Sequence, residues 1–177
     1  MAVGVFYRPD DYVGVGKRLL IDFIDTVSAI AGCALLTLLL IYTWPHARSL
    51  GIAIMSGWTA IWIGYFVFLK RSRFRTLGYA LTGARIVNLQ GQRPSVFSLV
   101  IRLLWVAGGP ANFVIDLFWI PSDPSRQAIR DKFAHTYVIK KAAVPLGESE
   151  IVYRTYNIFG TTFFFPEVRE LTSILRT

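Results

Sequence analysis

The sequence has 177 residues, of which 54% are hydrophobic and only 17% charged, with a formal net charge of +8. Soluble globular chains carry about 25% charged residues, so this one has too few charges to cover a soluble domain. It contains one cysteine, Cys33, and two histidines in separate segments, His46 and His135. An intrachain disulfide is therefore excluded, and we expect no metal site and no cofactor.

Two long stretches of the sequence, residues 26–45 and 49–69, contain no Asp, Glu, Lys or Arg. About 20 apolar residues are needed to cross a hydrocarbon layer of about 30 Å as a helix. We predict one helix from Val15 to Tyr42 and a second from Leu50 to Leu69. The chain is thus predicted to be a small polytopic integral membrane protein.

The first predicted helix carries charges near its start. Arg18, Asp22 and Asp25 are spaced four and three residues apart, so they share one helical face. Asp25 lies roughly 10 Å along the helix from Arg18, at a depth where a carboxylate needs a partner. One interpretation is structural, with an Arg18–Asp22 ion pair and Asp25 hydrogen-bonded to a neighbouring helix. The other is a proton or cation site lined by Asp25.

The loop after the second predicted helix is basic throughout. It contains no acidic residue and six basic ones: Lys70, Arg71, Arg73, Arg75, Arg85 and Arg93. The positive-inside rule places this loop and both termini in the cytoplasm, and His46 and Arg48 outside. The basic residues lie beside apolar stretches, so the expected partner is the lipid bilayer, with its anionic headgroups, and not nucleic acid.

A third apolar stretch runs from Val96 to Ile120 and is interrupted by Gly108-Gly109-Pro110. Basic residues dominate on both sides of it, which favours a re-entrant helical hairpin that turns at Gly109. Arg102 and Asp116 each lie seven residues from Gly109 and would form an intramembrane pair across the hairpin. A single kinked span is the alternative.

Several segments have strand character. Residues 84–90 and 135–141 are predicted to pair as a small cytoplasmic β element, and residues 151–165 form a further strand-like tail with a turn at 157–160. The three phenylalanines at 163–165 suit either membrane anchoring or a partner surface. A helix is predicted to begin at Pro166 and Glu167, with an apolar stripe of Val168, Leu171, Ile174 and Leu175.

The predicted fold class is an all-α membrane protein. It has two full transmembrane helices, a re-entrant hairpin or third span, the small cytoplasmic β element and a C-terminal extension.

Three ordered blocks resemble the RDD family of bacterial membrane proteins, which is named for one arginine and two aspartates. Arg18 and Asp25 match the spacing of the first block. The second block, RFRTLGYALTGARIVNLQG, has Arg73 or Arg75, Thr76, Gly78, Gly83, Ile86, Val87 and Gly91 at the family positions. The third, RQAIRDKFAHTYVI, matches at Arg126, Gln127, Asp131 and Thr136. His135 departs from the pattern because the family has a small residue there, and Asp22 is an additional acid.

The resemblance implies a membrane domain at residues 14–141, with residues 142–177 as an extension, and location in the bacterial cytoplasmic (inner) membrane. It also implies that Asp131 is the second family aspartate. We therefore expect one charged cluster of Arg18, Asp22, Asp25 and Asp131, acting as an ion or proton site or as a structural clamp.

Two functions remain open at the level of the sequence. The first is transport or ion handling, which two or three spans cannot perform alone because they enclose no pathway; a homo-oligomer or other membrane subunits are then required. The second is a non-catalytic accessory or assembly subunit that docks through its aromatic C-terminal tail. We do not expect an enzyme, because Ser28 and Ser98 have no candidate base nearby in the sequence to activate them as nucleophiles.

Overall fold

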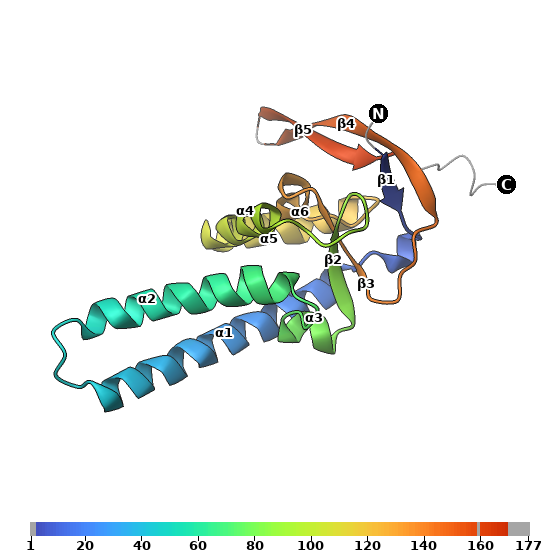
Figure 1. Ribbon diagram of the computed structural model, residues 1–177. Coiled ribbons are helices and arrows are strands. Elements are labelled where there is room, and N and C mark those ends of the chain that lie inside the picture. The colour runs from blue at the N-terminus through green and yellow to red at the C-terminus, as the bar shows by residue number, and fades with distance from the viewer. Residues whose placement is uncertain (1–2, 159, 170–177) are drawn as a thin grey trace. The chain divides into compact units, whose positions relative to one another are not determined.

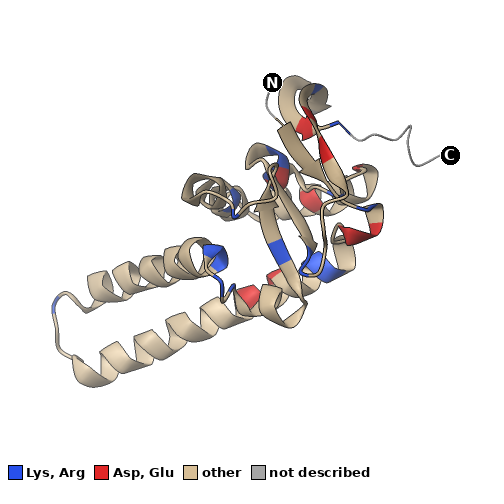
Figure 2. Ribbon diagram, turned by 45° about the vertical axis from the view of Figure 1, so that its right-hand side comes forward, with Lys and Arg blue, Asp and Glu red and all other residues tan. Residues whose placement is uncertain are grey.

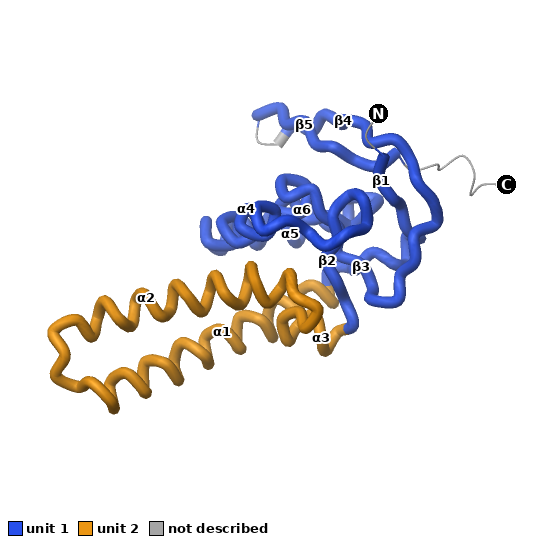
Figure 3. The backbone as a smooth tube through the Cα atoms, in the orientation of Figure 1, with its two compact units in different colours: residues 1–15, 83–177 blue, residues 16–82 orange. Residues whose placement is uncertain are grey.

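The computed structural model describes residues 3–158 and 160–169 and combines long helices with short strands (Figure 1). The chain divides into two compact units (Figure 3). Unit 1 comprises residues 1–15 and 83–177, and unit 2 comprises residues 16–82. Each unit is described by itself.

Unit 2 is a helical hairpin followed by a short helix. Helix α1 (Val15–Thr43) begins at Val15, which ends the first of the two segments of unit 1. Helix α2 (Leu50–Ile63) continues as a π-helical segment, η2 (Gly64–Leu69), and α3 (Leu77–Leu81) follows. The two long helices approach closely at Gly57, where an added Cβ would lie 2.3 Å from a Leu36 methyl carbon. Beside it, the Trp58 indole N–H donates to the Thr37 hydroxyl at 2.9 Å.

The bounds of these helices confirm the two long helices predicted from the uncharged stretches. Val15–Thr43 and Leu50–Leu69 are both long and apolar enough to cross a membrane. Large apolar side chains such as Leu35 and Ile52 are exposed along them, as expected for a lipid-facing surface. Most of the hairpin carries no charged residue (Figure 2). Apart from Arg48 in the loop between α1 and α2, the charges of unit 2 lie within residues 17–25 and 70–75.

The third apolar stretch belongs to unit 1 and forms two helices, α4 (Val96–Ala107) and α5 (Pro110–Trp119). The pair is bent by 111°, which makes it a broken span or a re-entrant loop, and α5 runs on into a 3-10 turn, η3 (Ile120–Ser122). Gly109 has a φ of 114°, a conformation that glycine adopts without strain. The predicted break at the Gly-Gly-Pro is thus confirmed.

Unit 1 also contains two antiparallel sheets. Strands β2 (Ala84–Asn88) and β3 (Thr136–Lys140) pair with Ile86 opposite Val138, which confirms the predicted small β element. The second sheet has the order β1-β4-β5 and is built from Val3–Phe6, Gly147–Ile158 and Thr161–Val168. Between β2 and β3 the chain also forms α6 (Ile129–Phe133), and between β1 and α1 the short turn η1 (Pro9–Asp11).

The predicted fold class, an all-α membrane protein, is wrong. The described residues of this chain contain five strands in addition to the helices. Its β1 strand comes from the start of the chain and pairs with β4, so Val3 lies opposite Glu150. A core of buried side chains joins the two sheets and includes Tyr12, Val87, Tyr137, Ile139 and Val168. This core holds unit 1 together. Its residues come from strands and loops, so a helical pattern of apolar residues in the sequence does not predict it.

The helix predicted to begin at Pro166 and Glu167 is also wrong at its start. Both residues lie in β5, where Pro166 is opposite Tyr153 and Glu167 opposite Val152. A proline is tolerated there because β5 is an edge strand and its outer side needs no N–H donor. Of the predicted apolar stripe, Val168 is the last residue of β5, and Leu171, Ile174 and Leu175 lie outside the described residues.

Candidate functional site: two groups of buried charges

In unit 2 the fully buried carboxylate of Asp25 accepts hydrogen bonds from three neutral donors. Its Oδ1 accepts from the Gly78 backbone N–H at 2.7 Å and from the Tyr65 hydroxyl at 3.1 Å. Its Oδ2 accepts from the Thr76 hydroxyl at 2.7 Å. Tyr65 comes from the π-helical segment η2, and its hydroxyl in turn accepts from the Leu77 N–H at 3.0 Å. Asp25 therefore joins α1 to the start of α3.

Gly78 is at this site because no side chain fits. A Cβ added there would lie 2.4 Å from the Ile21 carbonyl oxygen and 2.8 Å from Asp25 Oδ1. Thr76 and Gly78 belong to the second block that resembles the RDD family, and Asp25 belongs to the first. Two sequence blocks about 50 residues apart thus meet at a single carboxylate.

The other predicted members of the charged cluster are divided between the units. Arg18 is buried and Asp22 half-buried, and both lie in unit 2 with Asp25. Asp131 lies in unit 1. The single cluster of all four residues stays a prediction.

In unit 1 the fully buried Asp131 lies on α6 and forms an ion pair with Arg102 of α4. Arg102 also donates to the Thr136 hydroxyl at 2.9 Å, and the second oxygen of Asp131 accepts from the Ala128 N–H at 3.2 Å. Gln127 donates its side-chain amide N–H to the Thr136 carbonyl at 2.9 Å. The residues of the third family block, Gln127, Asp131 and Thr136, are thus joined to the third apolar stretch.

Asp116 of α5 also has a partner on α6. Its carboxylate lies 3.2 Å from the Arg130 guanidinium and accepts from the Arg130 N–H at 3.3 Å. Arg102 and Asp116, both buried, are therefore each paired with one of two consecutive α6 residues. Their predicted direct contact with each other stays a prediction.

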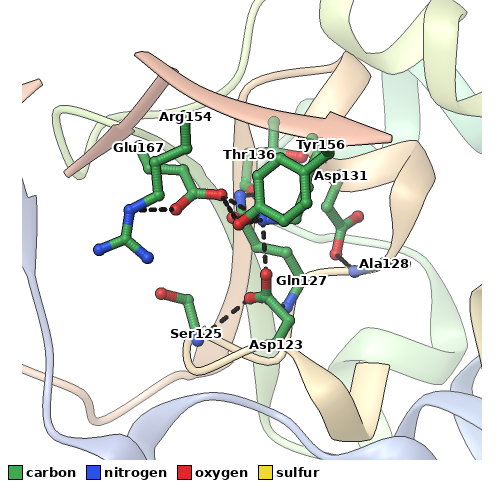
Figure 4. A network of polar contacts seen from close by, with 10 residues as sticks. Asp123, Ser125, Gln127, Ala128, Asp131, Thr136, Arg154, Tyr156 and Glu167 are labelled. Atoms are coloured by element: carbon green, nitrogen blue, oxygen red, sulfur yellow. Dashed lines mark hydrogen bonds and ion pairs between the residues drawn. The ribbon is translucent and has the colours of Figure 1, made fainter. Parts of the chain in front are cut away.

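Lys132, the next residue on α6, bridges the carboxylates of Asp123 and Glu167, which are labelled in Figure 4. Its ammonium lies 2.5 Å from Asp123 Oδ2 and 2.5 Å from Glu167 Oε1, and the Tyr156 hydroxyl donates to the same Glu167 oxygen at 2.6 Å. Asp123 is held in place by the N–H groups of Ser125 and Gln127, at 3.1 and 3.0 Å. Burial opposes the charge of Lys132, but Asp123 and Glu167 outweigh it and raise the pKa of the ammonium above its ordinary value.

We refer to these side chains together as the α6 charge cluster: Arg102, Asp116, Asp123, Arg130, Asp131, Lys132 and Glu167. Sequence reasoning identified three of them and missed Asp123, Arg130, Lys132 and Glu167. The consecutive charges Arg130-Asp131-Lys132 in a segment followed at once by a strand were the available signal, although such a run normally indicates a solvated surface.

The extension beyond the family blocks is part of this site. Glu167 of β5 reaches Lys132, and Phe165 of β5 packs edge-to-face on Phe133 of α6 with ring centroids 5.0 Å apart. Strand β5 therefore packs against α6. Within residues 3–158 and 160–169 no group of three or more His, Cys, Asp or Glu side chains is placed to hold a metal ion.

Comparison with known proteins identifies the family of this chain. The model of the RDD family matches residues 12–135, a range that includes Asp25, Thr76, Gly78, Arg102 and Asp131 and ends before β3, so that β1, β3, β4 and β5 lie outside it. No curated protein and no solved structure matches the chain. Because the match covers more than half of the sequence, and the chain has two helices able to cross a bilayer, the protein is a membrane protein that belongs to the RDD family.

Proposed function

We propose that this chain is a subunit of an oligomeric transport protein for protons or small cations. In this proposal the α6 charge cluster binds the transported ion. The observation that carries the proposal is the burial of Arg102 and Asp116 inside the bent apolar pair α4–α5. Ionisable side chains in such segments are costly and usually mark an ion pathway.

The charge balance of the cluster supports the same function. Four carboxylates, Asp116, Asp123, Asp131 and Glu167, meet three cations. A fourth cation, Arg154, is 3.5 Å from Glu167, but its side chain is half-exposed and its attraction is weakened by water. Lys132 shares its charge between two acids, so a proton or a small cation at this end of the cluster improves the balance.

Flux measurements test the proposal. The full chain is reconstituted in vesicles with a sodium or potassium gradient, and internal pH is followed with a dye. We expect cation-dependent proton flux that Asp116→Asn reduces to the level of empty vesicles, while Asp10→Asn, the same change at an exposed residue, leaves it unchanged. Folded, correctly inserted wild-type chain without any cation-dependent flux would contradict the proposal.

The proposed location is the bacterial cytoplasmic membrane, with both termini and the loop at 70–94 inside. It is supported by the basic residues after the second span. After replacement of Cys33, an impermeant thiol reagent added to intact cells should label a cysteine at Ser49 and not one at Ser72. The reverse pattern would overturn this orientation.

A second candidate function, assembly of a larger membrane complex, is favoured by the outer face of the β4–β5 hairpin. Tyr153 and Phe164 are 73% and 65% exposed. They lie on one face, because Thr155, two residues after Tyr153, is directly opposite Phe164. Under this alternative, Tyr153→Ser with Phe164→Ser releases a stoichiometric membrane partner, whereas Leu146→Ser, at an exposed site outside the face, retains it.

A further inference from the structure

A surface beside the second span combines exposed arginines with exposed apolar side chains. Arg71 and Arg73 follow η2 and are exposed. Phe74, Leu77 and Leu81 are 67%, 52% and 73% exposed. Leu77 and Leu81 lie four residues apart on α3 and so share one face of it. We call these five residues the α3 surface.

The segment that carries this surface is strongly basic. Between Asp25 and Asp116 the sequence contains no acidic residue, and Lys70, Arg71, Arg73 and Arg75 fall within six consecutive positions. The buried carboxylate of Asp25 lies at the start of α3, but these four cations outnumber it, so the potential at the α3 surface is positive and favours an anionic ligand.

The backbone that carries the surface is fixed from within unit 2. Lys70 places its ammonium over the rings of Phe66 and Tyr79, at 5.1 and 4.9 Å from their centroids. Asp25 holds Thr76 and Gly78 at the start of α3. The surface is thus preorganised, and a ligand does not need to order it.

The position of the surface in the chain identifies the partner. Leu69 ends an apolar helix long enough to cross a bilayer, and Arg71 lies two residues later. When that helix spans a membrane, the arginines lie at headgroup level and the apolar side chains of α3 lie beside the acyl chains. Basic side chains alternating with aromatic and aliphatic ones are typical of such interfacial elements. We propose that the α3 surface binds anionic phospholipid, with Arg71 and Arg73 on the phosphate and Phe74, Leu77 and Leu81 on the acyl chains.

The experiment measures phospholipid binding to the full chain in neutral detergent by native mass spectrometry, with phosphatidylglycerol and phosphatidylcholine as probes. Wild type should bind phosphatidylglycerol more tightly. Arg71→Gln with Arg73→Gln should weaken this binding about 25-fold, or about fivefold for each arginine. Arg8→Gln with Arg93→Gln removes the same charge from exposed residues outside the surface and should change it less than about twofold.

Two further measurements distinguish binding of a whole phospholipid from binding of its phosphate group alone. Phe74→Ser with Leu81→Ser should weaken phosphatidylglycerol binding while both arginines remain, and glycerol phosphate without acyl chains should not compete. Equal losses in the two arginine pairs, equal affinity for both lipids, or effective competition by glycerol phosphate would each overturn the proposal. A protein partner that depends on the surface, with no lipid selectivity, would also overturn it. Thermal unfolding of each variant verifies that the fold is intact.

Discussion

The two units bury acidic side chains in opposite ways. In unit 2, Asp25 is surrounded by neutral donors, the Tyr65 and Thr76 hydroxyls and the Gly78 N–H. In unit 1, Asp116, Asp123 and Asp131 each face a lysine or arginine of the α6 charge cluster. The first arrangement satisfies a carboxylate with dipoles, and the second neutralises it with charge.

This difference determines what each site tolerates. When Asp25 is replaced by asparagine, the neutral donors around it can keep their hydrogen bonds to the amide oxygen or turn toward another acceptor. A buried guanidinium or ammonium that loses its acid keeps a charge that its surroundings no longer balance, and that is strongly destabilising. The Asp25 site is therefore suited to joining α1 to α3, and the α6 charge cluster is sensitive to a change in any one charge.

The largest effect is expected for Asp131→Ala. The change leaves the buried Arg102 without its α6 carboxylate and the Ala128 N–H without its acceptor, so it should lower the free energy of unfolding by about 3–5 kcal/mol. Reversible unfolding in mixed micelles measures this loss. Asp10→Ala, at an exposed acid, should stay within about 0.5 kcal/mol. A cost for Asp131→Ala no larger than for Asp10→Ala would show that the ion pair contributes nothing.

Double-mutant cycles sharpen the assignment of partners. Arg102→Met with Asp131→Asn should give a coupling energy of about 1–3 kcal/mol, because the two side chains form an ion pair. The cycle of Arg102→Met with Asp116→Asn should give a smaller value, since Asp116 pairs with Arg130. If the second coupling equals or exceeds the first, the direct Arg102–Asp116 contact predicted from the hairpin is supported.

Much of the fold could be predicted because its signals are local. The uncharged stretches give α1 and the α2–η2 helix, Gly108-Gly109-Pro110 marks the bend, and β-branched residues mark β2 and β3. The turn of the β4–β5 hairpin was also predicted, and Gly160 there has a φ of 78°. Each of these follows from residues that are close together in the sequence.

The parts that could not be predicted depend on residues far apart. Strand β1 has four residues and pairs with a strand more than 140 positions later. Proline and glutamate at 166–167 suit the start of a helix as well as they suit an edge strand, and only pairing with β4 decides between them. The partners of Arg102, Asp116 and Lys132 likewise come from separate elements, and sequence spacing contains no information about them.

His135 has a backbone conformation that its sequence context does not predict. Its φ is 52°, in the left-handed region, where a residue without a branched or bulky side chain is least strained. The small residue of the family suits this conformation.

Gly78→Ala tests the close approach at Asp25. The new Cβ would meet the Ile21 carbonyl and Asp25 Oδ1, so α3 must move away from α1, at a cost of about 1–3 kcal/mol. Gly51→Ala is the matched control, because no atom lies within 4 Å of the added Cβ. It should stabilise α2 by up to about 1 kcal/mol. A neutral Gly78→Ala would mean that α3 is not fixed by the carboxylate.

A smaller effect is expected for Asp25→Asn. The amide oxygen can keep the bonds from Gly78 and Tyr65, and the Thr76 hydroxyl can turn to accept from the new NH₂ group, so the cost should be about 1 kcal/mol. Asp131→Asn should cost more, because an amide cannot neutralise Arg102. If Asp25→Asn and Asp131→Asn lowered the free energy of unfolding equally, the proposed difference between the two ways of burying an acid would be wrong. Loss of cation flux in a stable Asp25→Asn chain would assign Asp25 to the ion pathway.

The smallest effect concerns the response of the α6 charge cluster to alkali. The pKa of Lys132 in the folded chain is raised above its ordinary value of 10.5. The unfolded chain therefore releases this proton first as the pH rises. The stabilisation by the ammonium is fully present below pH 10.5 and is lost as the pH climbs through the higher folded pKa.

We expect the midpoint of thermal unfolding to fall more steeply above pH 10.5 in wild type than in Lys132→Met. The variant is less stable at neutral pH, because Asp123 and Glu167 then lack their shared cation, but it has no lysine at this position to titrate. Tyrosines ionise in the same range and give both proteins a common background slope, so the difference between the slopes is the quantity to measure. Parallel slopes would mean that Lys132 gains no more from its two carboxylates in the folded chain than in the unfolded one, and its bridging position would then be wrong.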